Sequence, residues 1–228
     1  MQLIYNTIKF TLDDGIGHLV LSQPPSNAMT LEFFLELGIL VGKMQEMQSL
    51  KAIIISGEGR HFSSGAALNE LLGLADIPSK GENQRNGTVL MDLLNRNLDA
   101  FLFFEQTEIP VISAIRGACL GSAFELAIFS HFRFCSEDAV IGLPETTFGL
   151  IPGIGGISGV AALAGKSIAM ELILRGNTFT GLEALKMNLV DGIFPKKQVV
   201  ASSIEFARSI IRNYNKRKKN LYLQRMIK

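Results

Sequence analysis

Two short, mainly apolar segments, each followed by a loop of small residues, constrain the fold of this chain most strongly. The first is Lys51-Ala-Ile-Ile-Ile55, which ends at Gly57, and the second is Pro110-Val-Ile-Ser-Ala-Ile115. Continuous runs rich in β-branched residues indicate strands buried on both faces, as in parallel sheets. Because helical patterns alternate with these strand patterns and parallel strands need crossover connections, the sequence predicts an α/β protein.

The remaining elements follow from periodicity and turn residues. A hairpin is expected at residues 7–12 and 16–22 around Asp13-Asp14-Gly15, and Thr30 is expected to cap a helix at 31–47. The apolar positions of that helix recur at helical spacing. Residues 61–72 are expected to begin as a Gly-containing loop and to pass into a helix. Further helices are predicted at about 88–105, 122–130, 155–164, 167–174, 180–187 and 196–213, a polar loop at 76–87, and strands at 132–136, 139–142 and 189–194.

Composition limits the class of protein. The 228 residues are 47% hydrophobic and 19% charged, which favours a well-packed domain, and the net charge of +1 points to no acidic partner. The three histidines are scattered, so no metal site is expected, and two cysteines are too few for a disulfide scaffold. We find no signal-peptide pattern and no apolar run of roughly 20 residues. A cytoplasmic protein that does not enter a membrane is expected.

Two glutamates lie among apolar and small residues. Glu125 follows Gly117-Ala-Cys-Leu-Gly-Ser-Ala-Phe, and Glu145 precedes Thr-Thr-Phe-Gly-Leu-Ile-Pro-Gly-Ile-Gly-Gly156. A carboxylate in such surroundings has lost water and needs a reason to be there. Paired carboxylates near one cavity are a common means of acid/base catalysis at neutral pH.

Two loops are candidates for anion stabilisation. Residues 60–70 follow the first buried strand, and residues 117–123 follow the second and open directly into a helix. The first amides of a helix lack internal partners and carry the positive end of its dipole. Two such loops side by side could direct two amides at one oxygen, although Gly-rich turns also serve tight packing alone. Gly153-Ile-Gly155-Gly156 follows Pro152 rather than a strand, so we discount a dinucleotide site.

Several motifs, in order, resemble the crotonase superfamily, also called the enoyl-CoA hydratase/isomerase family, over about residues 5–213. They are Pro24-Pro-Ser-Asn-Ala-Met29, Phe62-Ser-Ser-Gly-Ala66, Ile109-Pro-Val-Ile-Ser-Ala-Ile-Arg-Gly117, Gly121–Ala127, Pro144–Gly156 and Phe179–Asp191. The resemblance implies an α/β crotonase-like fold, a ββα superhelix in which strand-strand-helix turns form a spiral. It also implies a core domain at 1–195 and a truncated C-terminal helical segment with a basic tail at 196–228.

The resemblance also implies a site. By similarity, Glu125 and Glu145 would be catalytic, and the backbone amides of Ala66 and Ser122 would form an oxyanion hole for a thioester carbonyl. The residues implied to bind the substrate are Ala66, Ala67, Leu68, Asn69, Gly121 and Gly153. No separate cofactor is implied, because coenzyme A is part of the substrate, and no metal is implied.

The activity implied is hydration of a 2-enoyl-CoA across its C2=C3 bond. An enoyl-CoA isomerase is the alternative, since moving a proton between C2 and C4 can use one carboxylate. Eight basic residues and no acidic one follow Glu205, so RNA binding is a further alternative, and a non-catalytic CoA-binding protein is another. The expected partner is an acyl-CoA, nucleic acid is not expected, and a homotrimer or hexamer (a dimer of trimers) is implied.

The chain departs from the family pattern at several positions. Ala67 stands where many relatives have Asp, Ser122 where they usually have Gly, and Leu143 where a polar residue is often found. Relatives also commonly continue for some thirty residues in helices. Outside these motifs, His61 is expected to be a surface residue without a role, His131 to be structural, and Phe101, Phe103 and Phe104 to pack in the core rather than line an acyl pocket.

Overall fold

The computed structural model describes residues 1–67, 70 and 98–226, with the backbone alone described at 215–226. The predicted loop at 76–87, nearly all of the predicted helix within 61–72 and the first part of the predicted helix at 88–105 lie outside the described residues, as do Leu68 and Asn69. In the described part of the chain, no helix has both the length and the apolar character needed to cross a bilayer.

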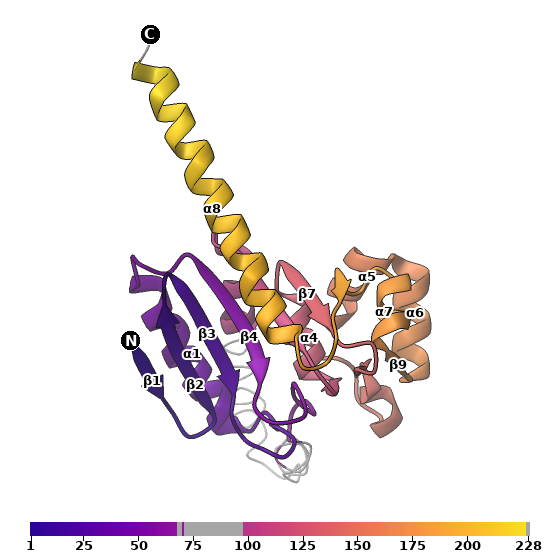
Figure 1. Cartoon of the computed structure of the whole chain (residues 1–228). Coiled ribbons are helices and arrows are strands. Elements are labelled where there is room, and N and C mark those ends of the chain that lie inside the picture. The colour runs from indigo at the N-terminus through magenta and orange to yellow at the C-terminus, as the bar shows by residue number, and fades with distance from the viewer. Residues whose placement is uncertain (68–69, 71–97, 227–228) are drawn as a thin grey trace.

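A seven-stranded sheet forms the centre of the molecule, in the order β1-β2-β3-β4-β5-β7-β10 (Figure 1). The first three strands pair antiparallel and the others pair parallel, which confirms the predicted hairpin and the predicted parallel core. The bounds are β1 Gln2–Ile4, β2 Ile8–Asp13, β3 Ile16–Leu21, β4 Ala52–Gly57, β5 Val111–Ile115, β7 Phe132–Cys135 and β10 Gly192–Ile193.

Alternate residues of the central strands contribute to two separate cores. On β4, Ile53 and Ile55 belong to the larger core, whereas Ala52 and Ile54 belong to the smaller one, as the two-residue period of a strand requires. Every residue of β4 and β5 is buried, which agrees with the continuous apolar runs. The sheet therefore needs helices on both of its faces.

The helices that cover the larger core come from several parts of the chain. Helix α1 (Leu31–Glu46) begins at Thr30, whose side chain accepts a hydrogen bond from the Phe33 amide, as predicted. The helical segment 98–106 buries Phe101 and Phe104 completely, so these aromatic rings are core residues, as expected. Helix α4 (Ser122–Ile128) follows β5 and the short strand β6 (Ala118–Leu120).

A second, smaller sheet is formed by three short strands, one before α4 and two after it. It has the order β6-β8-β9, with β6 at Ala118–Leu120, β8 at Val140–Gly142 and β9 at Thr178–Thr180. Figure 1 shows the helices between residues 156 and 186 grouped together on the side of the molecule away from β1. The other elements here are the 3₁₀ helix η1 (Pro144–Phe148), α5 (Gly156–Ala164), α6 (Lys166–Arg175) and α7 (Gly181–Lys186).

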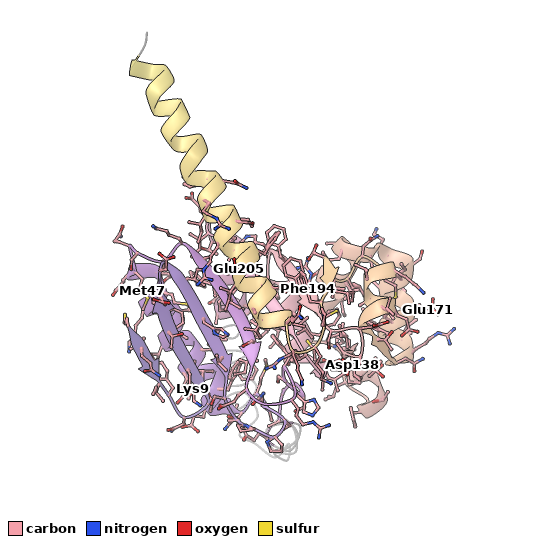
Figure 2. All side chains as sticks on the ribbon, in the orientation of Figure 1. Lys9, Met47, Asp138, Glu171, Phe194 and Glu205 are labelled. Carbon is pink, nitrogen blue, oxygen red and sulfur yellow. The ribbon has the colours of Figure 1, made fainter. Side chains whose placement is uncertain are left out.

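Helix α8 (Val199–Met226) crosses the face of the large sheet that holds the smaller core, and it extends beyond the sheet (Figure 1). Its buried Val199 and Ala207 belong to the smaller core. Phe206 packs edge-on against Phe132 and Phe134, with ring centroids 4.9 Å apart in both pairs. Figure 2 labels Phe194, just before this helix, and Glu205 on the part of the helix that crosses the sheet.

Two predicted boundaries were wrong. The strand expected at 189–194 is restricted to Gly192–Ile193, because the Leu189 amide instead bonds to the Ala184 carbonyl at the end of α7. The helix expected at 196–213 runs from Val199 to Met226, since no glycine or proline follows Pro195 to end it. The proposed division of the chain at residue 195 remains a prediction.

Candidate active site

The two loops predicted from the sequence lie side by side. Ser63 forms a parallel bridge with Cys119, and the Leu120 amide donates to the Ser63 carbonyl at 3.2 Å. A Cβ atom added to Gly65 (φ +88°) would lie 2.4 Å from the Leu120 carbonyl oxygen and 3.5 Å from the Ser122 nitrogen. Only glycine fits this contact, which brings the chain just before Ala66 against the start of α4.

Ala66 and Ser122 both present backbone amides beside this contact. Ser122 is the first residue of α4, so its amide has no partner within the helix. Among the described residues, neither the Ala66 amide nor the Ser122 amide donates a hydrogen bond to a protein acceptor. Two amides on adjacent loops are thus free to donate to an oxygen atom of a bound molecule.

Glu125 is almost completely buried in α4, with 1% of its surface exposed. Its Oε1 atom accepts hydrogen bonds from the amides of Ile154 (2.8 Å) and Gly156 (2.9 Å). Burial raises the pKa of this carboxyl, and the two amides, together with the Ser122 side chain, oppose that rise. A Cβ on Gly156 would lie 2.9 Å from Oε1, so the absence of a side chain there allows the amide to approach.

Glu145 lies in η1 and is half-buried. Within the described part of the chain its Oε2 atom is buried without a hydrogen-bond partner. Loss of solvent raises the pKa of Glu145 to about 7; a hydrogen bond to its own backbone opposes the rise, and the nearby charge of Glu125 adds to it. Its Oε1 atom would be 2.9 Å from a Cβ on Gly121, the residue that precedes α4, so Glu145 lies over the start of that helix.

The other predicted site residues lie around this centre, so far as they are described. Gly121 has φ +54° and sits under Glu145. Gly153 is exposed and precedes the Ile154 amide that binds Glu125. The Ala67 amide donates a hydrogen bond to the Met29 carbonyl at 2.9 Å. Leu68 and Asn69 are outside the described residues, and their assignment stays a prediction.

Sequence reasoning missed two contributions. The amides of Ile154 and Gly156 hold Glu125, a role that neither the resemblance nor the run Gly153-Ile-Gly155-Gly156 predicts. The expectation that His61 has no role was also wrong, because its Nδ1 atom accepts a hydrogen bond from the Ala118 amide at 3.0 Å. The structural role expected of His131 is confirmed, since its Nδ1 accepts from the Val111 amide at 3.0 Å.

This arrangement is suited to acid/base chemistry next to an oxygen that gains negative charge. It combines two amides without a protein acceptor in the described part of the chain, a buried carboxylate held by two other amides, and a second carboxyl whose pKa is about 7. Among the described residues, no group of three or more His, Cys, Asp or Glu side chains could hold a metal ion.

Comparisons with known proteins place this geometry in context. The model of the enoyl-CoA hydratase/isomerase family matches residues 11–222. The peroxisomal Δ(3,5)-Δ(2,4)-dienoyl-CoA isomerase of Arabidopsis thaliana is 31% identical over 199 residues, which are 86% of this chain and 72% of the relative. A protein of Bacillus subtilis (strain 168) named probable enoyl-CoA hydratase is 35% identical over 185 residues, covering 81% and 68% of the two chains.

Among solved structures, the enoyl-CoA hydratase of Geobacillus kaustophilus HTA426 superposes with a TM-score of 0.83 at 25% identity. The superposition covers 92% of this chain and 76% of that one. It confirms the crotonase-like α/β fold predicted from the sequence.

Proposed function

The chain belongs to the enoyl-CoA hydratase/isomerase family, and from that premise we propose that it adds water across the C2=C3 bond of a 2-enoyl-CoA thioester. The observation that carries the proposal is the unequal pair of carboxylates beside the start of α4. Glu125 has one oxygen fixed by two amides, whereas Glu145 has a buried oxygen without a hydrogen-bond partner among the described residues and a pKa of about 7. Hydration needs both a base and an acid, and these two environments suit the two roles.

The amides of Ala66 and Ser122 would receive the thioester oxygen. As the oxygen of water attacks C3, electrons move toward the carbonyl, and the negative charge of the enolate develops between these two donors. One preorganised donor of this kind typically lowers a barrier by about 3 kcal/mol. The adjacent loops support this role, since the chain at Gly65 packs against the start of α4.

Glu125 then acts as the base and Glu145 as the acid. Hydrogen bonds from Ile154 and Gly156 stabilise the anion of Glu125, which takes one proton from the attacking water. Glu145, which is about half protonated at a pH near 7, gives its proton to C2. The product is a 3-hydroxyacyl-CoA, and transfer of one proton from Glu125 to Glu145 restores the starting state.

Glutamine substitutions test this assignment. Glu125→Gln and Glu145→Gln should each lower the hydration rate of crotonyl-CoA by at least about 100-fold, because general acid and base catalysis contribute on that order. The measurement is the loss of absorbance of the conjugated thioester, with circular dichroism as a check on folding. Full activity of folded Glu125→Gln would exclude the two-carboxylate mechanism.

Isomerisation is the second candidate, favoured by the likeness to the Arabidopsis dienoyl-CoA isomerase. A carboxylate that removes a proton from one carbon and returns it to another could use the same amides to stabilise the intermediate. Incubation with a 3-enoyl-CoA and with a 3,5-dienoyl-CoA distinguishes the reactions, because isomerisation creates a new conjugated chromophore whereas hydration removes one. A protein that binds acyl-CoA but turns over none of these substrates would be a non-catalytic member.

We further propose that the protein assembles as a homotrimer or as a dimer of trimers, as the resemblance implies. Exposed apolar side chains on and next to η1 and on α6 support an interface there. They are Phe148, Ile151, Met170 and Leu174, each more than half exposed.

A further inference from the structure

His61 connects the two loops of the proposed site, although it lies outside the residues assigned to that site. It precedes Phe62 in the first loop, and its Nδ1 atom accepts a hydrogen bond from the Ala118 amide of the second loop at 3.0 Å. Ala66 follows His61 in its loop, and Ser122 follows Ala118 in the other. The imidazole therefore joins the two segments that carry the Ala66 and Ser122 amides.

The imidazole replaces a missing backbone acceptor. Further along the same pairing, Ser63 donates to the Ala118 carbonyl and accepts from the Leu120 amide, as in a parallel ladder. Two residues earlier, the ladder would pair the His61 carbonyl with the Ala118 amide. That carbonyl accepts instead from the Asn27 side chain at 2.9 Å, and the Phe62 amide, rather than the His61 amide, donates to the Arg116 carbonyl. The Ala118 amide is thus left to the His61 ring.

The surrounding residues leave room for this contact. Gly117 has φ +57°, and a Cβ atom there would lie 2.6 Å from His61 Nδ1 and 2.5 Å from the Arg60 carbonyl oxygen. Only glycine lets the ring approach the Ala118 amide along this path. A neutral imidazole that accepts at Nδ1 carries its proton on Nε2, so the contact also fixes the tautomer.

We propose that His61 is a positioning residue, which sets the spacing of the Ala66 and Ser122 amides by bonding the Ala118 amide. The proposal rests on the proposed function, because the spacing matters only if both amides bind one developing oxyanion. Small displacements of such donors have large effects on rate, since a 1 Å misplacement can cost about 100-fold. Ground-state binding depends less on this spacing, so the effect falls on kcat rather than on KM.

Three substitutions at His61 distinguish the effect of losing the hydrogen-bond acceptor from the effect of losing side-chain volume. His61→Ala removes the acceptor and should lower kcat for crotonyl-CoA by about 10-fold or more, with KM changed less than about 3-fold. His61→Asn places its Oδ1 atom at the same distance along the side chain as Nδ1 and should recover kcat to within about 3-fold of the wild type. His61→Gln carries its oxygen one bond further out and should resemble His61→Ala.

His131 provides a matched control. Its Nδ1 atom accepts from the Val111 amide at 3.0 Å, the same chemical contact at the opposite end of β5. His131→Ala should therefore lower the melting temperature without lowering kcat. If folded His61→Ala keeps wild-type kcat, or if His61→Asn is no better than His61→Gln, the positioning role is excluded.

Hydrogen exchange distinguishes this proposal from the proposed function. Absence of turnover by the wild-type protein would reject the function, whereas the contact itself is measured by exchange of the Ala118 amide. That amide should exchange at least about 10-fold faster in His61→Ala than in the wild type and His61→Asn. Equal exchange in all three proteins would show that the imidazole does not hold the second loop.

Discussion

At the residue scale, the ionisation of Glu145 should be visible in the stability of the protein. Its pKa rises from the ordinary value of 4.5 to about 7 on folding, chiefly because it loses solvent. Between these two values the folded state keeps a proton that the unfolded state has lost, so the free energy of unfolding decreases as the pH rises through this window. Below the window both states are protonated, and above it the destabilisation is complete.

Glu145→Gln removes this dependence. The variant should therefore gain melting temperature relative to the wild type at pH 8 but not at pH 4.5. Differential scanning calorimetry across this range measures the difference without any substrate. If the melting temperatures of Glu145→Gln and the wild type differ by the same amount at both pH values, the raised pKa of Glu145 is contradicted.

The site shows which residue-scale features can be predicted from sequence. Glu125 and Glu145 could be identified because each carboxylate stands among apolar residues, an arrangement that is costly without a purpose. The amides that hold Glu125 could not, because every residue except proline has an amide and only the fold directs it. The role of His61 depends on a shift in pairing between Phe62 and Arg116, which leaves no trace in the residue pattern.

At the element scale, α8 stabilises the sheet face opposite the larger core. Phe206→Ala should lower the free energy of unfolding by about 2–4 kcal/mol, because the ring packs against both Phe132 and Phe134. The turnover of each folded molecule should stay unchanged, because the two carboxylates lie on α4 and η1. Urea unfolding measures the first quantity and the initial rate per folded protein measures the second.

Tyr214→Ala is the control for this substitution. Tyr214 belongs to the same helix but is 65% exposed, so its removal should cost less than about 0.5 kcal/mol. Equal losses for the two variants would mean that α8 does not gain its stability from the aromatic contact with the sheet.

Element prediction succeeded where local pattern and tertiary packing agreed. The strands β4 and β5 and helix α1 have long apolar patterns, and their predicted buried faces are the observed ones. Of the three-residue strands, β8 was predicted but β1, β6 and β9 were not, because a segment of that length shows little period. The turn after α7 was predicted as a strand because Leu189 and Val190 are apolar, but these residues are buried in the turn that follows the helix.

At the scale of the whole molecule, the exposed apolar side chains at η1 and α6 predict self-association. Ile151 is 70% exposed and Leu174 is 69% exposed, and the Thr146 hydroxyl donates to the Ile173 carbonyl at 2.8 Å, which joins the two elements. Light scattering should give three or six times the chain mass of 24.9 kDa. Leu174→Asp should reduce that mass, because association would desolvate the new carboxylate at the interface.

The position of the interface is decided by a second variant. Leu35 is 55% exposed on α1, far along the chain from α6, and Leu35→Asp should leave the assembly intact. Dissociation by Leu35→Asp alone would place the interface on α1, and a wild-type monomer would reject the trimer.

Because η1 carries Glu145, an interface at η1 and α6 would also hold that carboxyl in place, so the Leu174→Asp protein should lose turnover in parallel with mass. A folded monomer with wild-type turnover would show that assembly and the site are independent.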